Sequence, residues 1–316
     1  MNNIIRFWNQ NRRGIIAGIA AIVLLIVMIQ VLDEIAKKQR QERNNGIAML
    51  ANEQKEELPT ESIIGGATVS KDTTKSNVEI IESFIEKCNN AQITEAYEML
   101  TEDCKEAIFT TEGIFKKGYY DIVFKNKRIV DIENFISREK RYTYRVTLYE
   151  DILSTGNAQN TQSYQDYITI DENSKNGKLN INSFICKKEI NKQAESKGIK
   201  ITVESQEIYK DNEKYQIKIE NNTDKRILID TRENSKSVYL VGENNVTYNS
   251  YISEIASNLY EIPANFFRNY EIKFEKIYST GIKAKGIVFS DIVLDCEKYK
   301  QTPDEIKERV KISINM

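Results

Sequence analysis

The spacing of hydrophobic residues changes along the chain, and each change predicts a different kind of structure. From Ile15 to Leu32, eighteen residues carry no charge, and only Gly18 and Gln30 are not clearly apolar. At about 1.5 Å per residue, a helix of this length nearly crosses a hydrocarbon core of roughly 30 Å. A helix buried in a soluble domain is usually shorter or carries a polar stripe. The run therefore predicts a transmembrane helix over residues 14–33.

The flanks of this run decide between a cleaved signal peptide and a permanent anchor. A signal peptide has an apolar region of roughly 7 to 15 residues that ends in small residues, whereas this run ends in "MIQVLDEIAKK". Arg12 and Arg13 abut one end, and Asp33 and Glu34 abut the other. By the positive-inside rule, we expect a single-pass plasma-membrane protein with residues 1–13 in the cytoplasm and its body outside the cell. The bilayer is then its first partner, through residues 15–32.

Residues 34–77 are expected to form a helical extension followed by a flexible linker. The segment "DEIAKKQRQERNN" is polar and rich in helix-forming residues. Pro59, Gly65, Gly66 and a Ser/Thr/Lys cluster then give the chain the composition of a linker. The short apolar patch "SIIGGATV" within it has a second interpretation, as a docking peptide.

Helical spacing begins near Asn77 and later gives way to alternation. In "SNVEIIESFIEKCNN" a Ser/Asn cap precedes apolar residues at helical intervals. "AQITEAYEMLTEDCKEAIF" continues that spacing with a second cap at "TED", and "TTEGIFKKGYYDIVFK" is ambiguous between helix and strand. The segments "RYTYRVTLYE", "YQDYITID" and "GKLNINSFIC" alternate with period two and predict antiparallel strands. Helices followed by strands indicate an α+β domain over residues 78–192.

A second domain is predicted over residues 198–316, where period-two alternation continues. "GIKITVESQEIYKDNEKYQIKIENNTDKRILID" contains three alternating stretches with turns at "KDNEK" and "NNTDK". "SVYLVGENNVTYNS", "YEIKFEKIY", "KGIVFSDIVLD" and "RVKISIN" add further strands. Seven or eight short strands at this spacing predict an all-β sandwich. Phe266 and Phe267 lie between strands and have two interpretations: the edge of the core, which is commoner, or a contact with a partner.

Composition excludes several classes of function. The formal net charge is -2 and the pI is about 5.7, whereas nucleic-acid binders normally carry a basic domain or stripe. The chain contains no histidine, so Ser-His-Asp and Cys-His catalytic sites are impossible. A zinc site would need cysteine or carboxylate ligands alone. We therefore expect no nucleic-acid partner and none of the common hydrolase mechanisms.

The cysteines and acidic residues form no recognisable metal motif. The four cysteines lack a C-x-x-C pair and are Cys88, Cys104, Cys186 and Cys296. We expect buried free thiols. A disulfide between Cys88 and Cys104 is the alternative if these two residues lie on neighbouring helices. Asp291 and Asp295 in "FSDIVLD", and Asp230 and Glu233 in "DTREN", lack the dense spacing of a calcium loop. The sequence therefore predicts no metal site and no cofactor.

Two segments are similar to known families. The run from about Val78 to Ile190, with "AYEMLTEDCKEAI" in its helices and "DYITIDENSKNGKLNINSFI" closing its strands, resembles the cone-shaped nuclear transport factor two-like fold with a curved antiparallel sheet. The segment is similar to domains of this fold that follow a membrane anchor in Gram-positive envelope proteins, including the domains of conjugative transfer machinery. The patterns "YQIKIENNT", "ILID" and "FSDIVLD" are similar to small immunoglobulin-like modules of bacterial surfaces. The Cys-Trp-Cys core of antibody domains is absent, because Trp8 is the only tryptophan.

The resemblance implies an apolar cup, in which family enzymes use an Asp or His base and Tyr or Asp donors. The residues that such a cup would use are Tyr97, Tyr120, Tyr144, Tyr167 and Asp166. A tyrosine on a strand is more often core or interface than catalytic, so no catalytic or cofactor-binding residue is assigned.

We expect a non-enzymatic protein that holds an assembly or a protein partner at the bacterial cell envelope, as in a conjugation or secretion apparatus. The alternative is a small-molecule binder or an isomerase-like enzyme that uses the cup. An open cup would favour this alternative, and a cup filled by the protein's own side chains would favour assembly.

Overall fold

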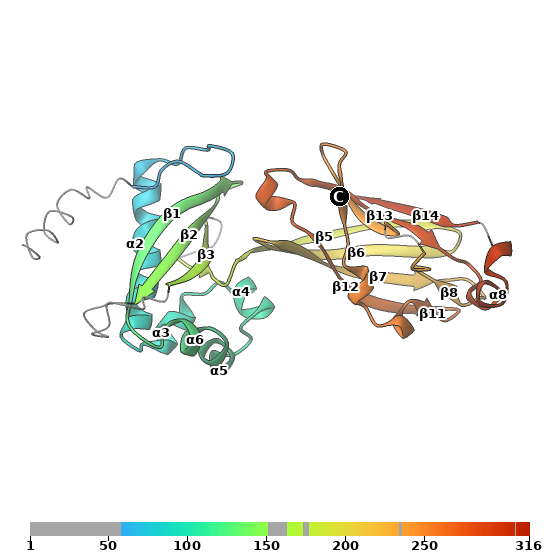
Figure 1. Cartoon of the computed structure of the whole chain (residues 1–316), viewed down its shortest axis with the longest axis horizontal. Coiled ribbons are helices and arrows are strands. Elements are labelled where there is room, and N and C mark those ends of the chain that lie inside the picture. Colours follow the sequence, from blue (N-terminus) through green and yellow to red (C-terminus); the bar gives the residue numbers. More distant parts are fainter. Residues whose placement is uncertain (1–57, 151–162, 173–176, 234–235, 307) are drawn as a thin grey trace, which may run out of the picture. The chain divides into compact units, whose positions relative to one another are not determined.

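Helices come first and antiparallel strands follow in this α+β chain, as the computed structural model shows (Figure 1). The described residues are 58–150, 163–172, 177–233, 236–306 and 308–316. The predicted cytoplasmic tail, transmembrane helix and helical extension lie outside these ranges. Within them, no helix combines the length and the apolar character needed to cross a bilayer. Residues 58–316 cluster as one unit.

Short helices follow one long helix in the first part of the unit. Their bounds are α2 Lys71–Asn89, α3 Ile93–Glu98, α4 Glu102–Ala107, α5 Glu112–Phe115, the π-helical turn η1 Lys116–Tyr120, and α6 Asp121–Val123. Helix α2 begins before the predicted start near Asn77, because the Ser70 side chain accepts the N–H of Thr73 and caps it. Thr101, in the predicted "TED" signal, caps α4 in the same way by accepting the N–H of Cys104. The segment that was ambiguous in sequence is helical.

A four-stranded sheet packs against these helices. Its strands, in the spatial order β1-β2-β3-β4, are β1 Arg128–Arg138, β2 Arg141–Glu150, β3 Ser163–Asp171 and β4 Leu179–Asn180. Tyr144, Val146 and Leu148 of β2 are buried in the core shared with the helices, as their alternation predicts. Strand β1 was missed in sequence. Its register shifts between Asn134 and Ile136, and this irregularity interrupts the period-two pattern.

The last part of the predicted linker is folded, which corrects the sequence-based interpretation of residues 58–77. The Ile63 N–H donates to the Asn134 carbonyl at 2.9 Å, and the Ile64 N–H donates to the Phe135 carbonyl at 2.8 Å. The patch "SIIGGATV" therefore lies along the edge of β1 in its own chain. Its two glycines have positive φ, which permits the tight turn between the two sides of this hairpin. Composition indicated a linker because a turn and a linker use the same residues.

The second part of the unit contains two further four-stranded antiparallel sheets. One has the order β12-β7-β6-β5 and the other the order β10-β9-β13-β14. The strands are β5 Phe184–Ser196, β6 Ile199–Tyr209, β7 Asn212–Asn221, β9 Val238–Gly242, β10 Thr247–Asn249, β12 Phe266–Glu275, β13 Ala284–Ile292 and β14 Val310–Asn315. Strands β8 Ile227–Leu228 and β11 Glu261–Ile262 form a small separate pair. The connections between strands contain the short helices η2 Ile252–Glu254, η3 Ser257–Leu259, η4 Tyr278–Thr280, α8 Cys296–Gln301 and η5 Pro303–Glu305.

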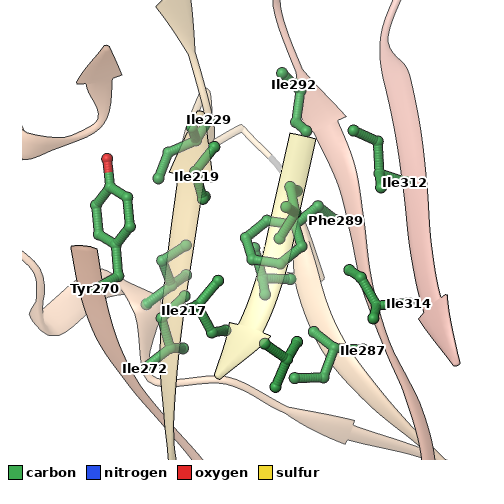
Figure 2. Packing of buried hydrophobic residues seen from close by; sticks show 14 of the residues in the cluster. Ile217, Ile219, Ile229, Tyr270, Ile272, Ile287, Phe289, Ile292, Ile312 and Ile314 are labelled. Atoms are coloured by element: carbon green, nitrogen blue, oxygen red, sulfur yellow. The ribbon is translucent and has the colours of Figure 1, made fainter. Parts of the chain in front are cut away.

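One apolar core joins these two sheets. Ile217 and Ile219 of β7 belong to the same buried cluster as Phe289 of β13 and Ile312 of β14, and Figure 2 shows their side chains directed toward one another. Every second residue of β7 is buried, which is the alternation that the sequence shows. Strand β5 pairs with β6 along its whole length. It thus belongs to the sheet of the second part, although the whole strand precedes the predicted start at residue 198 and residues 184–192 were assigned to the first domain.

Candidate functional site

The interior that would form a catalytic cup is filled by the protein's own aromatic rings. Phe115 and Tyr119 stack with ring centroids 5.9 Å apart, and Phe109 meets Phe115 edge-on at 5.6 Å. Phe84 of α2 lies 6.5 Å from Phe115. All four rings are fully buried in the core between the helices and the first sheet. Side chains of the chain itself therefore occupy the space between these helices and the first sheet.

A buried acid and a tyrosine nevertheless meet in this core. The Tyr119 hydroxyl donates to Oδ2 of Asp166 at 2.8 Å, and the backbone N–H of Asn182 donates to the same oxygen at 3.0 Å. Oδ1 accepts the N–H groups of Tyr167 at 2.7 Å and Ser183 at 3.0 Å. Four donors therefore surround a carboxyl group that is 1% exposed. Burial raises the pKa of Asp166, and the four hydrogen bonds oppose that rise.

The backbone after β4 is shaped to hold this carboxyl group. Asn182 and Ser183 have φ angles of 57° and 63°, in the left-handed region that residues other than glycine rarely adopt. This conformation lets the N–H groups of both residues reach Asp166. The hydrogen bonds offset the cost of the backbone conformation. Asp166 thus fixes the corner at which the chain leaves the first sheet for β5, which is a structural role.

The hydroxyl groups of the tyrosines named from the sequence do not converge on Asp166. The Tyr97 hydroxyl donates to the Phe109 carbonyl at 2.9 Å, and the Tyr144 hydroxyl accepts from the Asn77 amide at 3.1 Å. Tyr120 is partly buried and stacks on Phe124. Tyr167 packs against Phe135, with ring centroids 4.7 Å apart, in a separate cluster. Sequence reasoning missed Tyr119, although the four-residue spacing of Phe115, Tyr119 and Val123 marks the buried face of a helix.

A cavity of about 270 Å³ lies elsewhere, between β5, β6, β7 and the loops around η4. Its wall includes Glu139, whose carboxylate lies 2.6 Å from Lys283 Nζ and 3.2 Å from Lys188 Nζ. Its wall also includes the buried Glu213, which accepts hydrogen bonds from Gln206, from the Tyr215 hydroxyl and from the Tyr278 N–H. Glu139 is thus paired with two lysines, and Glu213 is held by neutral donors, so both carboxyl groups have partners in the cavity wall.

The Tyr278 ring also lines this cavity. Its hydroxyl is buried and has no hydrogen-bond partner within the described ranges. Burial raises the pKa of Tyr278. The hydroxyl therefore stays protonated and neutral near neutral pH.

Phe266 and Phe267 form an exposed aromatic pair at the start of β12. They are 51% and 48% exposed, and their rings stack with centroids 5.8 Å apart. The interpretation as a core edge is therefore wrong. Within the described part of the chain, β12 is an edge strand: β7 pairs with one side, and an isolated bridge between Ser250 and Phe274 reaches the other. Lys218 Nζ lies 4.6 Å from the centroid of the Phe267 ring.

The acids considered as calcium ligands have structural partners. Asp291 accepts from Arg309 Nε at 2.9 Å and from the Thr231 N–H at 3.0 Å, and Asp295 caps α8. Asp230 accepts the N–H of Arg232. Over the described ranges, the acids and cysteines form no group of three that could hold a metal ion.

The four cysteines are buried and unpaired, as expected. Burial raises the pKa of Cys104 to about 12 and that of Cys186 to about 11. The thiolate, which is the reactive and metal-binding form, is therefore disfavoured at these positions.

Comparison with known proteins gives little further information. No protein-family model matches the chain, and no curated protein matches it. The solved structure of a functionally unknown protein from Listeria monocytogenes EGD-e is similar, with 10% sequence identity and a TM-score of 0.27. The match covers 39% of this chain and 80% of that chain. A likeness of this size carries no argument about function.

Proposed function

We propose that this protein is a non-catalytic, membrane-anchored module that binds a protein partner at the bacterial cell envelope. The observation that carries the proposal is the exposed pair of Phe266 and Phe267 at the start of the edge strand β12, away from the bridge to Ser250 near its other end. Two stacked aromatic rings in water expose a large apolar area, and such area is typical of protein contact sites. An edge strand also offers unpaired backbone groups to an incoming strand. The partner therefore adds a strand to β12 and buries the two rings.

The filled interior around Phe115 supports a binding role over a catalytic one. An enzyme of the cone-shaped type needs an open cup in which substrate reaches the acid. Here Asp166 is enclosed by donors from its own chain. The alternative of a small-molecule binder or isomerase that uses this cup gains no support from the packing.

The proposal includes the location and the two fold families. Residues 15–32 anchor the chain in the plasma membrane, with residues 1–13 in the cytoplasm and the remainder outside the cell. The part before β5 is nuclear transport factor two-like, and the part from β5 onward is immunoglobulin-like. The order of helices, first sheet and two packed sheets supports this assignment. A membrane-tethered module suits positioning of a partner, as in a conjugation or secretion apparatus, because tethering raises the effective concentration of the binding surface.

Site-specific photo-crosslinking in whole cells tests the proposal. A benzophenone amino acid at position 267 of the full-length protein should give a discrete crosslinked protein, and Phe266→Ala should reduce its yield. The same amino acid at Val246, which is also about half exposed, is the matched control and should give no such product. Equal crosslinking from both positions, or none from position 267, would contradict the partner site. External protease that leaves residues 58–316 intact in whole cells would contradict the location.

A further inference from the structure

The edge of β12 is open over a short stretch that is bounded at both ends. The Tyr251 N–H donates to the Lys273 carbonyl at 2.7 Å, on the side of β12 that does not pair with β7. The strand begins at Phe266, directly after Asn265, which has a φ of 54°. In the described part of the chain, no strand pairs with this side of β12 between Phe266 and Ile272.

The Lys273 carbonyl shows which residues offer backbone groups to a new strand. The N–H and C=O groups of one residue point to the same side of a strand, and the side alternates from residue to residue. The register between β12 and β7 has no shift, so Phe267, Asn269 and Glu271 point to the open side, as Lys273 does. The side chains of these three residues are exposed. The open stretch is therefore symmetric about Asn269.

We propose that the strand that pairs with this edge is β12 of a second copy of the chain, antiparallel and related by a two-fold axis at Asn269. This inference rests on the proposed function, because it names the partner that adds a strand to β12. Asn269 then faces Asn269 of the second copy, and Phe267 of each copy faces Glu271 of the other. Each of these three pairs exchanges two bonds, which gives about six backbone hydrogen bonds.

This register alone pairs all three residues without conflict. Moving the axis by one residue to Tyr270 sets Phe267 opposite Lys273 of the second copy, whose carbonyl is already bonded to Tyr251. Moving it by one residue to Arg268 sets the two Arg268 side chains opposite each other, and like charges in that position destabilise a sheet. In both cases one of the three residues also loses its partner.

The side chains that meet in the proposed register are compatible in charge. A charged residue on the axis would face its own copy, whereas Asn269 is neutral. Glu271 of the second copy lies beside Phe267, and Lys218 Nζ lies 4.6 Å from the centroid of that Phe267 ring. Unlike charges therefore approach each other across the interface, and the two-fold axis repeats this contact.

The pairing also brings together exposed aromatic rings. Tyr251 is 38% exposed, and its backbone lies opposite Lys273 of its own copy. Phe266 of the second copy lies opposite Ile272, one position further along the same edge. Tyr251 and Phe266 of different copies are thus neighbours, and their contact covers apolar area that each copy exposes alone.

A pair of copies is a closed assembly. Pairing of β12 with itself uses the open stretch of both copies at once, so it leaves none for a third chain. Two chains anchored in one bilayer through residues 15–32 also meet at a high effective concentration, so a short strand pair holds them together.

Disulfide formation on the axis tests the inference. Membranes that contain full-length Asn269→Cys are treated with copper phenanthroline and compared on non-reducing gels. Opposed, hydrogen-bonded residues have Cα atoms about 5.5 Å apart, which a disulfide can bridge. Glu271→Cys is the matched control on the same strand, because its two copies lie four positions out of register, about 14 Å apart. We expect at least about fivefold more disulfide-linked dimer from Asn269→Cys than from Glu271→Cys or Val246→Cys.

Two further measurements check the register. Differently tagged Phe267→Cys and Glu271→Cys chains, expressed together, should form a mixed disulfide that neither forms alone. The wild-type cysteines are buried and should give no dimer. Asn269→Asp sets two carboxylates opposite each other, so it should reduce the product of twice the chain mass, crosslinked by benzophenone at position 267, to less than about half.

The outcomes separate the second copy from the partner site. Equal disulfide formation at positions 269, 271 and 246 overturns the second copy, because it shows random collision. Absence of a dimer from Asn269→Cys, with benzophenone at position 267 attached to a protein of another mass, also overturns the second copy but leaves the partner site. Absence of both the disulfide and any product at position 267 overturns both proposals.

Discussion

Tyr119→Phe is the substitution that best separates a structural acid–tyrosine pair from a catalytic one. The change removes only the hydroxyl that donates to Asp166 at 2.8 Å and keeps the ring that packs on Phe115. A hydrogen bond to a charged group contributes about 1.5–3 kcal/mol to stability. We therefore expect the free energy of unfolding to fall by about 2 kcal/mol. A site residue kept for catalysis would behave differently, because removing such a group often leaves stability unchanged or raises it.

Tyr144→Phe is the matched control. Tyr144 is equally buried, but its hydroxyl accepts from the neutral Asn77 amide at 3.1 Å. A hydrogen bond between neutral groups contributes about 0.5–1.5 kcal/mol, so the loss should be smaller. Urea unfolding of the full-length proteins in mild detergent, followed by circular dichroism, gives both values. Tryptophan fluorescence is unsuitable because Trp8, the only tryptophan of the sequence, lies outside the residues that the structure describes.

The pH dependence gives an independent check on the same pair. The Tyr119 hydroxyl lowers the pKa of Asp166, against the rise caused by burial. A bond that lowers the pKa of an acid stabilises its ionised form, so its contribution is present above that pKa and is lost as the pH falls through it. The stability difference between wild type and Tyr119→Phe should therefore shrink as the medium is acidified, whereas the difference for Tyr144→Phe should stay constant. Unchanged or increased stability of Tyr119→Phe at neutral pH would refute the structural role.

Three further predictions concern other parts of the unit. Glu139→Gln should reduce stability by no more than about 1 kcal/mol near neutral pH, since the site is largely solvated. The hydrogen bond from Lys283 helps lower the pKa of Glu139 to about 2. The stability difference between wild type and Glu139→Gln should therefore disappear as the pH falls from about 4.5 toward 2. Urea unfolding midpoints measured across this pH range would show the loss. Lys140→Gly should stabilise the protein by about 0.5–1 kcal/mol in thermal unfolding, because Lys140 has a φ of 62° in the β1–β2 turn; a lower melting temperature would contradict this. The four cysteines should resist maleimide at pH 8 until denaturant is added, because all are buried; rapid labelling of the native protein would show that the core opens.

Local patterns identified many of the elements because they report on burial one residue at a time. Alternation in β2 and β7 and the cap at Thr101 each needed only neighbouring residues to be recognised. Strand β1 and the hairpin before α2 were missed for a physical reason. A register shift disrupts the first, and the second is stabilised by backbone hydrogen bonds to a strand about seventy residues away.

The candidate sites show the same division. Asp166 was named from the sequence as an acid within a strand, but only the fold brings Tyr119, Asn182 and Ser183 to it. Phe266 and Phe267 were recognised as aromatic, yet their exposure depends on which strand lies at the edge of a sheet.

By itself, the sequence determined the absence of histidine chemistry, the apolar run at residues 15–32 and the order of helices before strands. Only the tertiary structure decided that rings fill the space around Asp166 and that the phenylalanine pair faces solvent. The reason is that composition and spacing are properties of the chain, whereas exposure and hydrogen-bond partners depend on segments far apart in sequence that meet only after folding.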